Sequence, residues 1–382
     1  MKMRNKRIFF IDPQSMKNLS IYDYGVLSEI KSEVTYICSK YYDYLPMRDN
    51  ITFKKLFSYN NINNPIVKVL SYLLSYIRIF ILIYNEKPIL IHVQWLRLHI
   101  FDYIFYLSIK HLFKLKLVYT AHNLLPLNHG MRYRWIFNKI YKLFDSIIVH
   151  SEKTKQEMLS LFHICEGKVY INHHGILRME YNKVAYKIKS DNYQSKYSLS
   201  DKIVFTSLGE QSYYKAIDLI VDVWSSTPEL YNNNNIKLLI VGKHKGIDFH
   251  QFDNISNVLV EDRKIPNEEF IFLLRHTDVY LLPYRTISQS GALFTALAEH
   301  VPVLVSDAGG LSEPLSIAKV GWKIKSNDYE DLKKQLLYLS QNIKEIKEVK
   351  KNEQNWNKVC KEYEWRVISL RMAFIYECTL SH

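Results

Sequence analysis

The sequence predicts an α/β protein with two doubly wound domains that follow one another along the chain and face a common cleft. Three observations support this fold class. The chain has 382 residues, about twice the size of an ordinary domain. Short β-branched runs alternate with amphipathic helical patterns, which is typical of open parallel sheets. The alternation stops in a polar segment at residues 181–202 and then starts again.

The first set of elements occupies residues 1–180, which we expect to form the N-terminal domain. Its strands are short apolar runs, and its helices have apolar residues at helical spacing. The expected strands are residues 7–11, 33–38, 89–93, 115–120, 146–150 and 169–172, and the expected helices are residues 100–113, 134–143 and 152–162.

The most apolar stretch of the chain, residues 69–84, requires a separate interpretation. A membrane span needs about 20 apolar residues without charge, whereas this stretch contains Arg78 and is soon followed by Glu86. Two interpretations remain open. The stretch is either a helix packed on the sheet, with Arg78 reaching solvent, or a helix that lies at a membrane interface.

The second set of elements occupies residues 203–354, the expected C-terminal domain, after a linker at residues 181–202. The expected strands are residues 203–208, 237–241, 257–260, 279–283, 302–306 and 321–324, and the expected helices are residues 216–225, 268–276, 291–300 and 329–339. Residues 355–382 form one further amphipathic segment, which either caps the second domain or crosses back to the first.

Composition excludes several classes of protein. Hydrophobic residues make up 48% of the chain and charged residues 23%, as in folded globular proteins. The four cysteines have no CxxC spacing, which argues against a zinc site and against a disulfide framework. The apolar run at residues 8–11 is interrupted by Asp12 and Pro13, too early for a secretion signal. We therefore expect a cytoplasmic protein.

The net charge of +13 is unevenly distributed along the chain. Residues 1–180 carry 25 Lys and Arg against 13 Asp and Glu, whereas residues 181–382 carry 26 against 25. The positive charge therefore belongs to the first half, where it indicates an anionic partner: nucleic acid, a membrane surface or a phosphorylated substrate.

The segment at residues 278–313 has the pattern of an anion-binding site. A buried strand is followed by a hydroxyl-rich loop and then by a helix, whose first N–H groups are free to bind a diphosphate. A Gly-Gly turn follows the next strand, and the carboxylate after this turn is suited to accept hydrogen bonds from ribose or sugar hydroxyls. The candidate nucleotide-sugar-binding residues here are Arg285, Ser290, Gly291, Ala292, Gly309, Gly310 and Glu313.

A second candidate segment follows the first strand of the C-terminal domain. Gly209 ends this strand, and Lys215 lies at the start of the next helix. A lysine in this position can neutralise a leaving diphosphate. Alone, it would equally be an exposed lysine of no special function.

Polar residues also follow buried strands in the first half of the chain. We expect His92, His122, Asn123 and His174 to bind the acceptor. His122 is in addition a candidate for contact with the transferred sugar or for a general base. A single histidine after a strand is more often structural, and this interpretation stays open for each of them.

Together these segments resemble the retaining family 4 glycosyltransferases of the GT-B fold. The resemblance rests on Thr120, His122 and Asn123, on Tyr214-Lys215, and on the run from Leu282 to Gly310 that is followed by Glu313. It implies two Rossmann-like domains, of which the first binds the acceptor and the second the nucleotide sugar. It also implies that the C-terminal helix returns to the first domain.

The sequence departs from the family pattern at four positions. Many members carry two glutamates around the helix that follows the Ser-Gly pair, where this chain has Ile287 and Thr295. Ser212 stands in place of a common arginine, and Ala216 in place of the glycine after the family's lysine.

The resemblance implies a hexosyltransferase that retains the anomeric configuration, with His122, Lys215 and Glu313 as catalytic candidates. On this interpretation Lys215 binds the diphosphate, alone or together with Arg285 or Arg263. No cofactor or metal is expected, and the sequence contains no DxD triplet. The expected acceptor is a saccharide linked to a lipid diphosphate, in surface polysaccharide or glycolipid biosynthesis. The basic first half then predicts peripheral docking on the inner, anionic face of a membrane.

Three alternatives remain. A nucleotide-sugar epimerase of the same fold needs several carboxylates, and only Asp307 and Glu313 are evident. A non-catalytic homologue acting as a partner subunit would explain the two missing glutamates. A nucleic-acid-binding protein would carry clustered basic residues, which occur here only at residues 132–134 and at the N-terminus.

Overall fold

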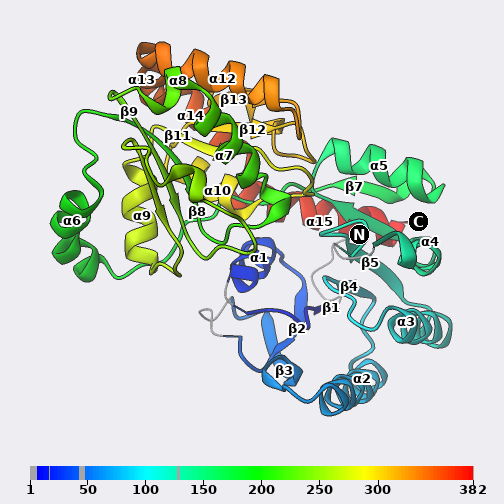
Figure 1. Cartoon of the computed structure of the whole chain (residues 1–382). Helices are drawn as coiled ribbons and strands as arrows, with labels where there is room; N and C mark the ends of the chain where they lie inside the picture. The colour runs from blue at the N-terminus through cyan, green and yellow to red at the C-terminus, as the bar shows by residue number, and fades with distance from the viewer. Residues whose placement is uncertain (1–6, 17, 43–47, 127–129, 382) are drawn as a thin grey trace. The chain divides into compact units, whose positions relative to one another are not determined.

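The computed structural model describes residues 7–16, 18–42, 48–126 and 130–381 (Figure 1). The basic N-terminal residues 1–6 thus lie outside the described residues. The chain divides into two compact units. The first unit comprises Met1–Gly175 together with Tyr363–His382, and the second unit comprises Ile176–Glu362.

The first unit is built on a parallel sheet of seven strands in the order β3-β2-β1-β4-β5-β6-β7. Each strand pairs in parallel with its neighbours, for example Ile8 of β1 with Val34 of β2 and Leu90 of β4. The strands are β1 (Arg7–Ile11), β2 (Glu33–Ser39), β3 (Ile51–Phe57), β4 (Leu90–Val93), β5 (Lys116–Thr120), β6 (Ser146–Val149) and β7 (Val169–Ile171).

Helices cover both faces of this sheet, because alternate residues of a strand point to opposite faces. Phe9 and Ile11 of β1 join a core with α2, α3, α4 and α5, whereas Ile8 and Phe10 join a second core with α1 and α15. The helices are α1 (Asn18–Leu27), α2 (Pro65–Glu86), α3 (His99–Phe113), α4 (Arg134–Leu143), α5 (Glu152–Phe162) and α15 (Trp365–Ser381).

Strand β3 is the one element of this sheet that the sequence did not predict. It lies at the edge of the sheet and its sequence, ITFKKLF, has Lys54 and Lys55 at its centre. An edge strand keeps one side in solvent and tolerates such charges, so it lacks the continuous apolar run of the buried strands.

The apolar stretch at residues 69–84 lies in helix α2, which packs on the sheet with only one of its faces. Tyr72, Tyr76, Ile79 and Ile83 pack into the core on one face of the helix. The other face is apolar as well but exposed, and Arg78 lies on it. By length and composition alone α2 can cross a membrane, with a mean hydropathy of 2.0 over 18 residues, of which 28% are buried.

The second unit contains a parallel sheet of six strands in the order β10-β9-β8-β11-β12-β13. The strands are β8 (Ile203–Leu208), β9 (Ile236–Val241), β10 (Val258–Glu261), β11 (Val279–Leu282), β12 (Val303–Ser306) and β13 (Gly321–Ile324). The helices are α6 (Lys183–Tyr197), α7 (Ile217–Ser226), α8 (Pro228–Tyr231), α9 (Asn267–Arg275), α10 (Gly291–Ala298), α11 (Glu313–Ile317), α12 (Tyr329–Gln341), α13 (Ile343–Lys351) and α14 (Glu353–Glu362). The prediction of two doubly wound sheets is confirmed.

Residues 181–202, where the sequence predicts an unpatterned linker, contain helix α6. Only Tyr193 and Tyr197 of this helix are buried, which is too few to give the sequence an apolar period. Asn182 caps the helix by accepting hydrogen bonds from the N–H groups of Val184 and Ala185. The helix packs on α9, where Tyr193 contacts the ring of Phe272.

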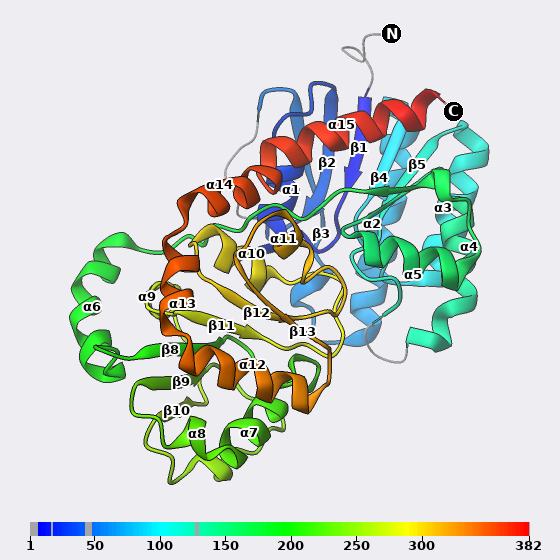
Figure 2. The same ribbon diagram turned by 90° about the horizontal axis from the view of Figure 1, so that it is seen from above.

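The C-terminal segment forms two helices, α14 in the second unit and α15 in the first. Figure 2 shows α15 lying across the strands of the first sheet, on which it packs. The ring of Trp365 fills the space beside Gly25 and Gly175, where a Cβ atom would lie 2.1 Å and 2.4 Å from it. Ser369 Oγ donates a hydrogen bond to the carbonyl of Val26 on α1. The C-terminal helix is therefore an integral part of the first unit.

Candidate functional site

In the second unit, the predicted nucleotide-binding residues lie in loops after the carboxyl ends of β8, β11 and β12, where ligands bind in open α/β sheets. Gly209 follows β8 with a φ of +88°, and a Cβ atom on Gly242 would lie 1.7 Å from its carbonyl oxygen. The turns after β8 and β9 thus touch through glycine backbones. This close approach requires glycine at residue 242.

Lys215 ends a short 3-10 turn, Tyr213–Lys215, before α7. Burial lowers the pKa of its ammonium group to about 8, although the charge of Glu210 partly offsets this effect. Its Nζ lies 5.9 Å from the centroid of the Tyr284 ring, and it forms no ion pair with any residue of the described ranges. A half-buried ammonium that forms no ion pair with a described carboxylate is a candidate for binding an anion.

Arg285 is already occupied by protein groups. Its guanidinium forms a bidentate ion pair with Asp218, at 2.7 Å and 2.8 Å, and donates to Asn327 Oδ1 at 2.7 Å. It also donates to the carbonyl of Tyr213, while its backbone N–H donates to the carbonyl of Tyr214. Arg285 therefore holds the turn that carries Lys215, and in this arrangement its donors do not face an open site.

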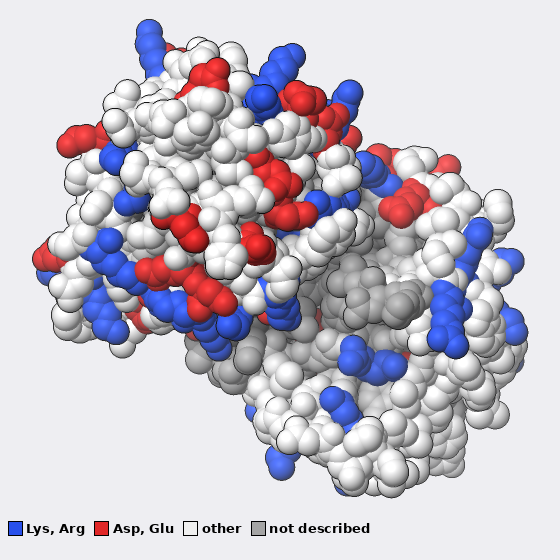
Figure 3. Space-filling view, viewed as in Figure 1, with Lys and Arg blue, Asp and Glu red and all other residues white. Residues whose placement is uncertain are grey.

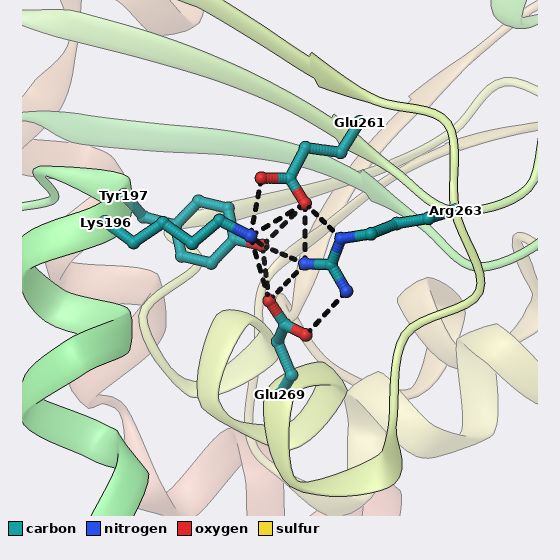
Figure 4. Close-up of polar contacts among 5 residues, drawn as sticks. All are labelled: Lys196, Tyr197, Glu261, Arg263 and Glu269. Carbon is teal, nitrogen blue, oxygen red and sulfur yellow. Dashed lines mark hydrogen bonds and ion pairs between the residues drawn. The ribbon is translucent and has the colours of Figure 1, made fainter.

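Arg263 is occupied in the same way, in a cluster that joins three elements (Figure 4). Its guanidinium pairs with Glu261 at the end of β10 and with Glu269 on α9. Lys196 and Tyr197 at the end of α6 bind the same two carboxylates. Two cations and two anions balance one another here, so of the three predicted cations only Lys215 forms no ion pair with a described residue.

Helix α10 begins at Gly291 after an N-cap at Ser290, whose hydroxyl accepts from the N–H of Leu293. The N–H groups of Gly291 and Ala292 have no hydrogen-bond partner among the described residues, and Gly291 is exposed. Burial raises the pKa of Tyr284, and the neighbouring side chain of Ser290 partly offsets this rise. The Nζ of Lys215, 5.9 Å from the Tyr284 ring, and the N-cap of α10 thus both lie beside this tyrosine. The free N–H groups at the start of a helix are suited to bind a diphosphate.

The Gly309-Gly310 turn packs against the loop that precedes α10. A Cβ atom on Gly309 would lie 1.9 Å from the carbonyl oxygen of Ile287, and the N–H of Gly310 donates to the carbonyl of Ser288. Glu313, half-buried, begins α11 directly after this turn, and its N–H donates to the carbonyl of Gly310. The turn thus connects Glu313 to the loop that leads to α10.

The two positions without the family glutamates have clear structural roles. Thr295 is buried in α10 and its hydroxyl donates to the carbonyl of Gly291 at 2.9 Å. Ile287 is half-buried, and its carbonyl oxygen lies against Gly309. Neither side chain offers a charge to a ligand.

In the first unit, the predicted acceptor-binding histidines belong to a buried hydrogen-bonded chain. His92 Nδ1 lies 2.6 Å from the hydroxyl of Tyr376, and its Nε2 lies 3.0 Å from Nε2 of Gln94. Gln94 Oε1 lies 2.8 Å from His122 Nε2, and His122 Nδ1 lies 3.2 Å from His150 Nε2. The chain spans adjacent strand ends, which brings residues distant in sequence together.

Burial keeps these imidazoles uncharged. It lowers the pKa of His92 and of His150 to about 3, that of His174 to about 4, and that of His122 well below its usual value. Both nitrogens of His122 are engaged, so acting as a general base requires it to give up one of these hydrogen bonds. Its ring stacks on Trp95 at 4.4 Å.

The remaining predicted residues lie close to this chain. The ring of His174 lies 5.2 Å from that of Tyr22, which also contacts His122 at 5.0 Å and His150 at 5.6 Å. Asn123 is half-buried next to His122. Within the described ranges, no group of three or more His, Cys, Asp or Glu side chains is arranged to hold a metal ion.

Sequence reasoning missed Gln94, Trp95, His150 and Tyr22. Gln94 and Trp95 stand in the same strand end as His92, and His150 directly follows β6. For Gln94, Trp95 and His150 the available signal was their position at or directly after the end of a buried strand. Tyr22 lies within helix α1, where the sequence gives no such signal.

Comparisons with known proteins match both units. Residues 189–356 match the family model described as glycosyl transferases group 1, and residues 27–176 match the one described as glycosyltransferase family 4. An uncharacterized glycosyltransferase of Methanocaldococcus jannaschii is 25% identical over 174 residues, which are 44% of this chain and 43% of that protein. The chain thus spans less than half of this curated relative.

Solved structures show the same fold over nearly the whole chain. Sucrose-phosphate synthase from Thermosynechococcus elongatus matches with a TM-score of 0.71 and 16% identity, covering 98% of this chain and 99% of that one. HepE of Anabaena, solved in complex with UDP and glucose, matches with a TM-score of 0.68 and 10% identity, covering 98% and 100%.

Proposed function

Since this chain belongs to the group 1 and family 4 glycosyltransferases and has their GT-B fold, we propose that it transfers a hexose from a nucleotide-diphosphate sugar to a lipid-linked saccharide with retention of configuration. The single observation that carries this proposal is the uncompensated Lys215 near the free N–H groups at the start of α10. Together they would form a diphosphate site in which Lys215 supplies the side-chain cation, since Arg285 and Arg263 are paired with carboxylates.

In the proposed mechanism, the diphosphate accepts hydrogen bonds from the N–H groups of Gly291 and Ala292. Lys215 lies against the developing negative charge of the leaving group, where a poorly solvated ammonium stabilises the transition state more than it would in water. Glu313 holds ribose or sugar hydroxyls. The bond from the anomeric carbon to the phosphate oxygen breaks, and the acceptor oxygen bonds to the anomeric carbon on the same face. The departing phosphate takes the proton of the acceptor hydroxyl.

Within this proposal the two arginines act at a distance from the substrate. Arg285 is a positioning residue, because its hydrogen bonds fix the turn before Lys215. Arg263 stabilises the contact of α6 with α9 and β10. The reaction would need no metal, since Lys215 and backbone N–H groups supply the positive charge.

The donor is best tested first as a UDP sugar, because HepE was solved with UDP and glucose. Thermal melting with UDP, GDP and ADP should show a rise for one nucleotide, since a ligand that binds only the folded state raises the melting temperature. Lys215→Ala should remove this rise and abolish sugar transfer. Normal nucleotide binding and transfer by Lys215→Ala would refute the proposed site.

A second candidate is a non-catalytic homologue that binds a nucleotide sugar as a partner subunit. The replacement of two family glutamates by Ile287 and the buried Thr295 favours it. The same assays separate the two candidates: a non-catalytic homologue shows the nucleotide-dependent rise in melting temperature but no transfer to any acceptor.

We also propose peripheral docking of the first unit on the anionic inner face of a membrane. The exposed face of α2 supports this, because its exposed residues from Ile66 to Tyr84 are apolar except for Arg78. Its exposed residues are Ile66, Val67, Val69, Leu70, Leu74, Ile77, Phe80, Ile81 and Tyr84. In Figure 3 the visible surface over β3, α2 and α3 is mostly white with blue patches, whereas acidic and basic side chains are intermixed over the second unit.

A further inference from the structure

A cavity of about 660 Å³ in the first unit lies apart from the histidine chain, between the start of α3 and the segment leading into α4. This volume falls in the range of small-molecule sites. Its walls are mostly apolar and include Ile100, Phe101, Ile104 and Trp135. Three of these, Ile100, Ile104 and Trp135, are more than half exposed. An open apolar wall of this kind suits a hydrocarbon chain.

The polar residues of the cavity are basic. Arg97, Arg132 and His99 line it, and no Asp or Glu does within the described part of the chain. Arg132 is exposed and forms no hydrogen bond or ion pair with a described residue. It differs in this from Arg285 and Arg263, whose charges are neutralised by carboxylates.

His99 supplies a second, independent observation. Its ring lies between Tyr133 and Phe137, at centroid distances of 5.3 Å and 4.9 Å. Its Nδ1 atom is buried and has no hydrogen-bond partner in the described part of the chain. A buried polar atom without a partner is unfavourable, so a ligand that bonds to it contributes to binding.

From this combination we infer that the cavity binds the alkyl phosphate of the acceptor, with the hydrocarbon chain on the Ile100, Ile104 and Trp135 wall and the phosphate at Arg132. The inference rests on the proposed function, since it assigns the lipid part of the proposed acceptor to a place in the first unit. Guanidinium and phosphate form strong charge-assisted hydrogen bonds, which fits Arg132, since no described residue pairs with it.

The test is isothermal titration calorimetry of the full chain with dodecyl phosphate, kept below its critical micelle concentration. Inorganic phosphate supplies the charge without the chain, and dodecyl maltoside supplies the chain without the charge. Dihexanoyl phosphatidylglycerol represents an ordinary bilayer lipid. We expect dodecyl phosphate to bind at least ten times more tightly than each of the other three.

Two variants and two matched controls locate the binding. Arg132→Gln and Ile104→Ser should each weaken dodecyl phosphate binding about tenfold, which corresponds to about 1.4 kcal/mol. Arg134→Gln and Leu112→Ser change an exposed arginine and an exposed leucine that do not line the cavity, and should leave binding unchanged.

A failure of this inference can be distinguished from a failure of the proposed function, because the two concern different ligands. UDP titrated into the same samples reports on the second unit, so its loss counts against the nucleotide site and not against the cavity. Equal binding of dodecyl phosphate by Arg132→Gln and the unchanged protein would overturn the inference. So would phosphatidylglycerol binding as tightly as dodecyl phosphate, which would assign the cavity to bilayer lipid, or inorganic phosphate binding as tightly, which would assign it to a free anion.

Discussion

Replacing Lys215 by methionine should stabilise the protein without ligand and at the same time abolish nucleotide binding. Burial lowers the pKa of Lys215 from 10.5 to about 8. The charged ammonium is therefore less stable in the folded protein than in the unfolded chain. The corresponding free energy is about 3 kcal/mol at pH 7. Methionine has a similar length and no charge, so we expect about 1–3 kcal/mol of added stability.

The direction of the pKa shift determines how the stability gain of Lys215→Met changes with pH. In the unfolded chain Lys215 titrates near 10.5, so between pH 8 and 10.5 the unfolded state binds more protons than the folded state. The burial cost of the charge is therefore fully present below pH 8 and disappears as the pH rises through this window. The stability difference between Lys215→Met and the unchanged protein should shrink accordingly.

Urea denaturation at pH 7.0 and at pH 9.5, with and without UDP, measures both effects. UDP at about 100 times its dissociation constant should add about 2.7 kcal/mol to the unchanged protein and nothing to the variant. Lys264→Met serves as the control, since Lys264 is exposed. The reasoning fails if Lys215→Met is less stable than the unchanged protein at pH 7.0, or if it still gains stability from UDP.

Three further substitutions test other parts of the molecule. Gly309→Ala should lower the free energy of unfolding by at least about 2 kcal/mol in urea denaturation and remove UDP binding. The reason is that φ at residue 309 is +50° and a Cβ atom there would lie 1.9 Å from the carbonyl oxygen of Ile287. An alanine variant of normal stability would contradict this close approach. Gln94→Leu should lower kcat with little change in KM for the donor, since it removes the hydrogen bond to His122; unchanged kcat would show that the chain is only structural. Ile77→Glu on the exposed face of α2 should weaken sedimentation with anionic vesicles about tenfold at low salt, without altering UDP binding; equal sedimentation would exclude this face as the docking surface.

Most strands of both sheets were predictable because buried parallel strands are nearly continuous apolar runs. Strand β1 and strand β8 have the predicted bounds. The edge strand β3 and helix α6 escaped prediction for the same reason, since each buries only a few residues and keeps the rest in solvent. Local sequence carries little signal for an element that is fixed mainly by its contacts.

The candidate site was predictable where it depends on the local backbone and not where it depends on partners. The Ser290 cap and the Gly309 turn are properties of short segments, and both were evident in the sequence. The sequence does not reveal that Asp218 engages Arg285, 67 residues away, or that Gln94 lies between His92 and His122. Such pairings arise only when the sheet brings distant loops together.

The place of α15 in the first unit has a consequence for synthesis on the ribosome. Residues 1–175 are made first, but the face of their sheet that Ile368, Met372 and Tyr376 cover stays open until the last helix emerges. At about 5–20 residues per second, this delay is roughly 10–40 s. During this interval a nascent chain exposes the groove beside Gly25 and Gly175 that Trp365 later fills. This face of the first unit therefore cannot be covered until the residues of the second unit, which precede α15 in the sequence, have been made.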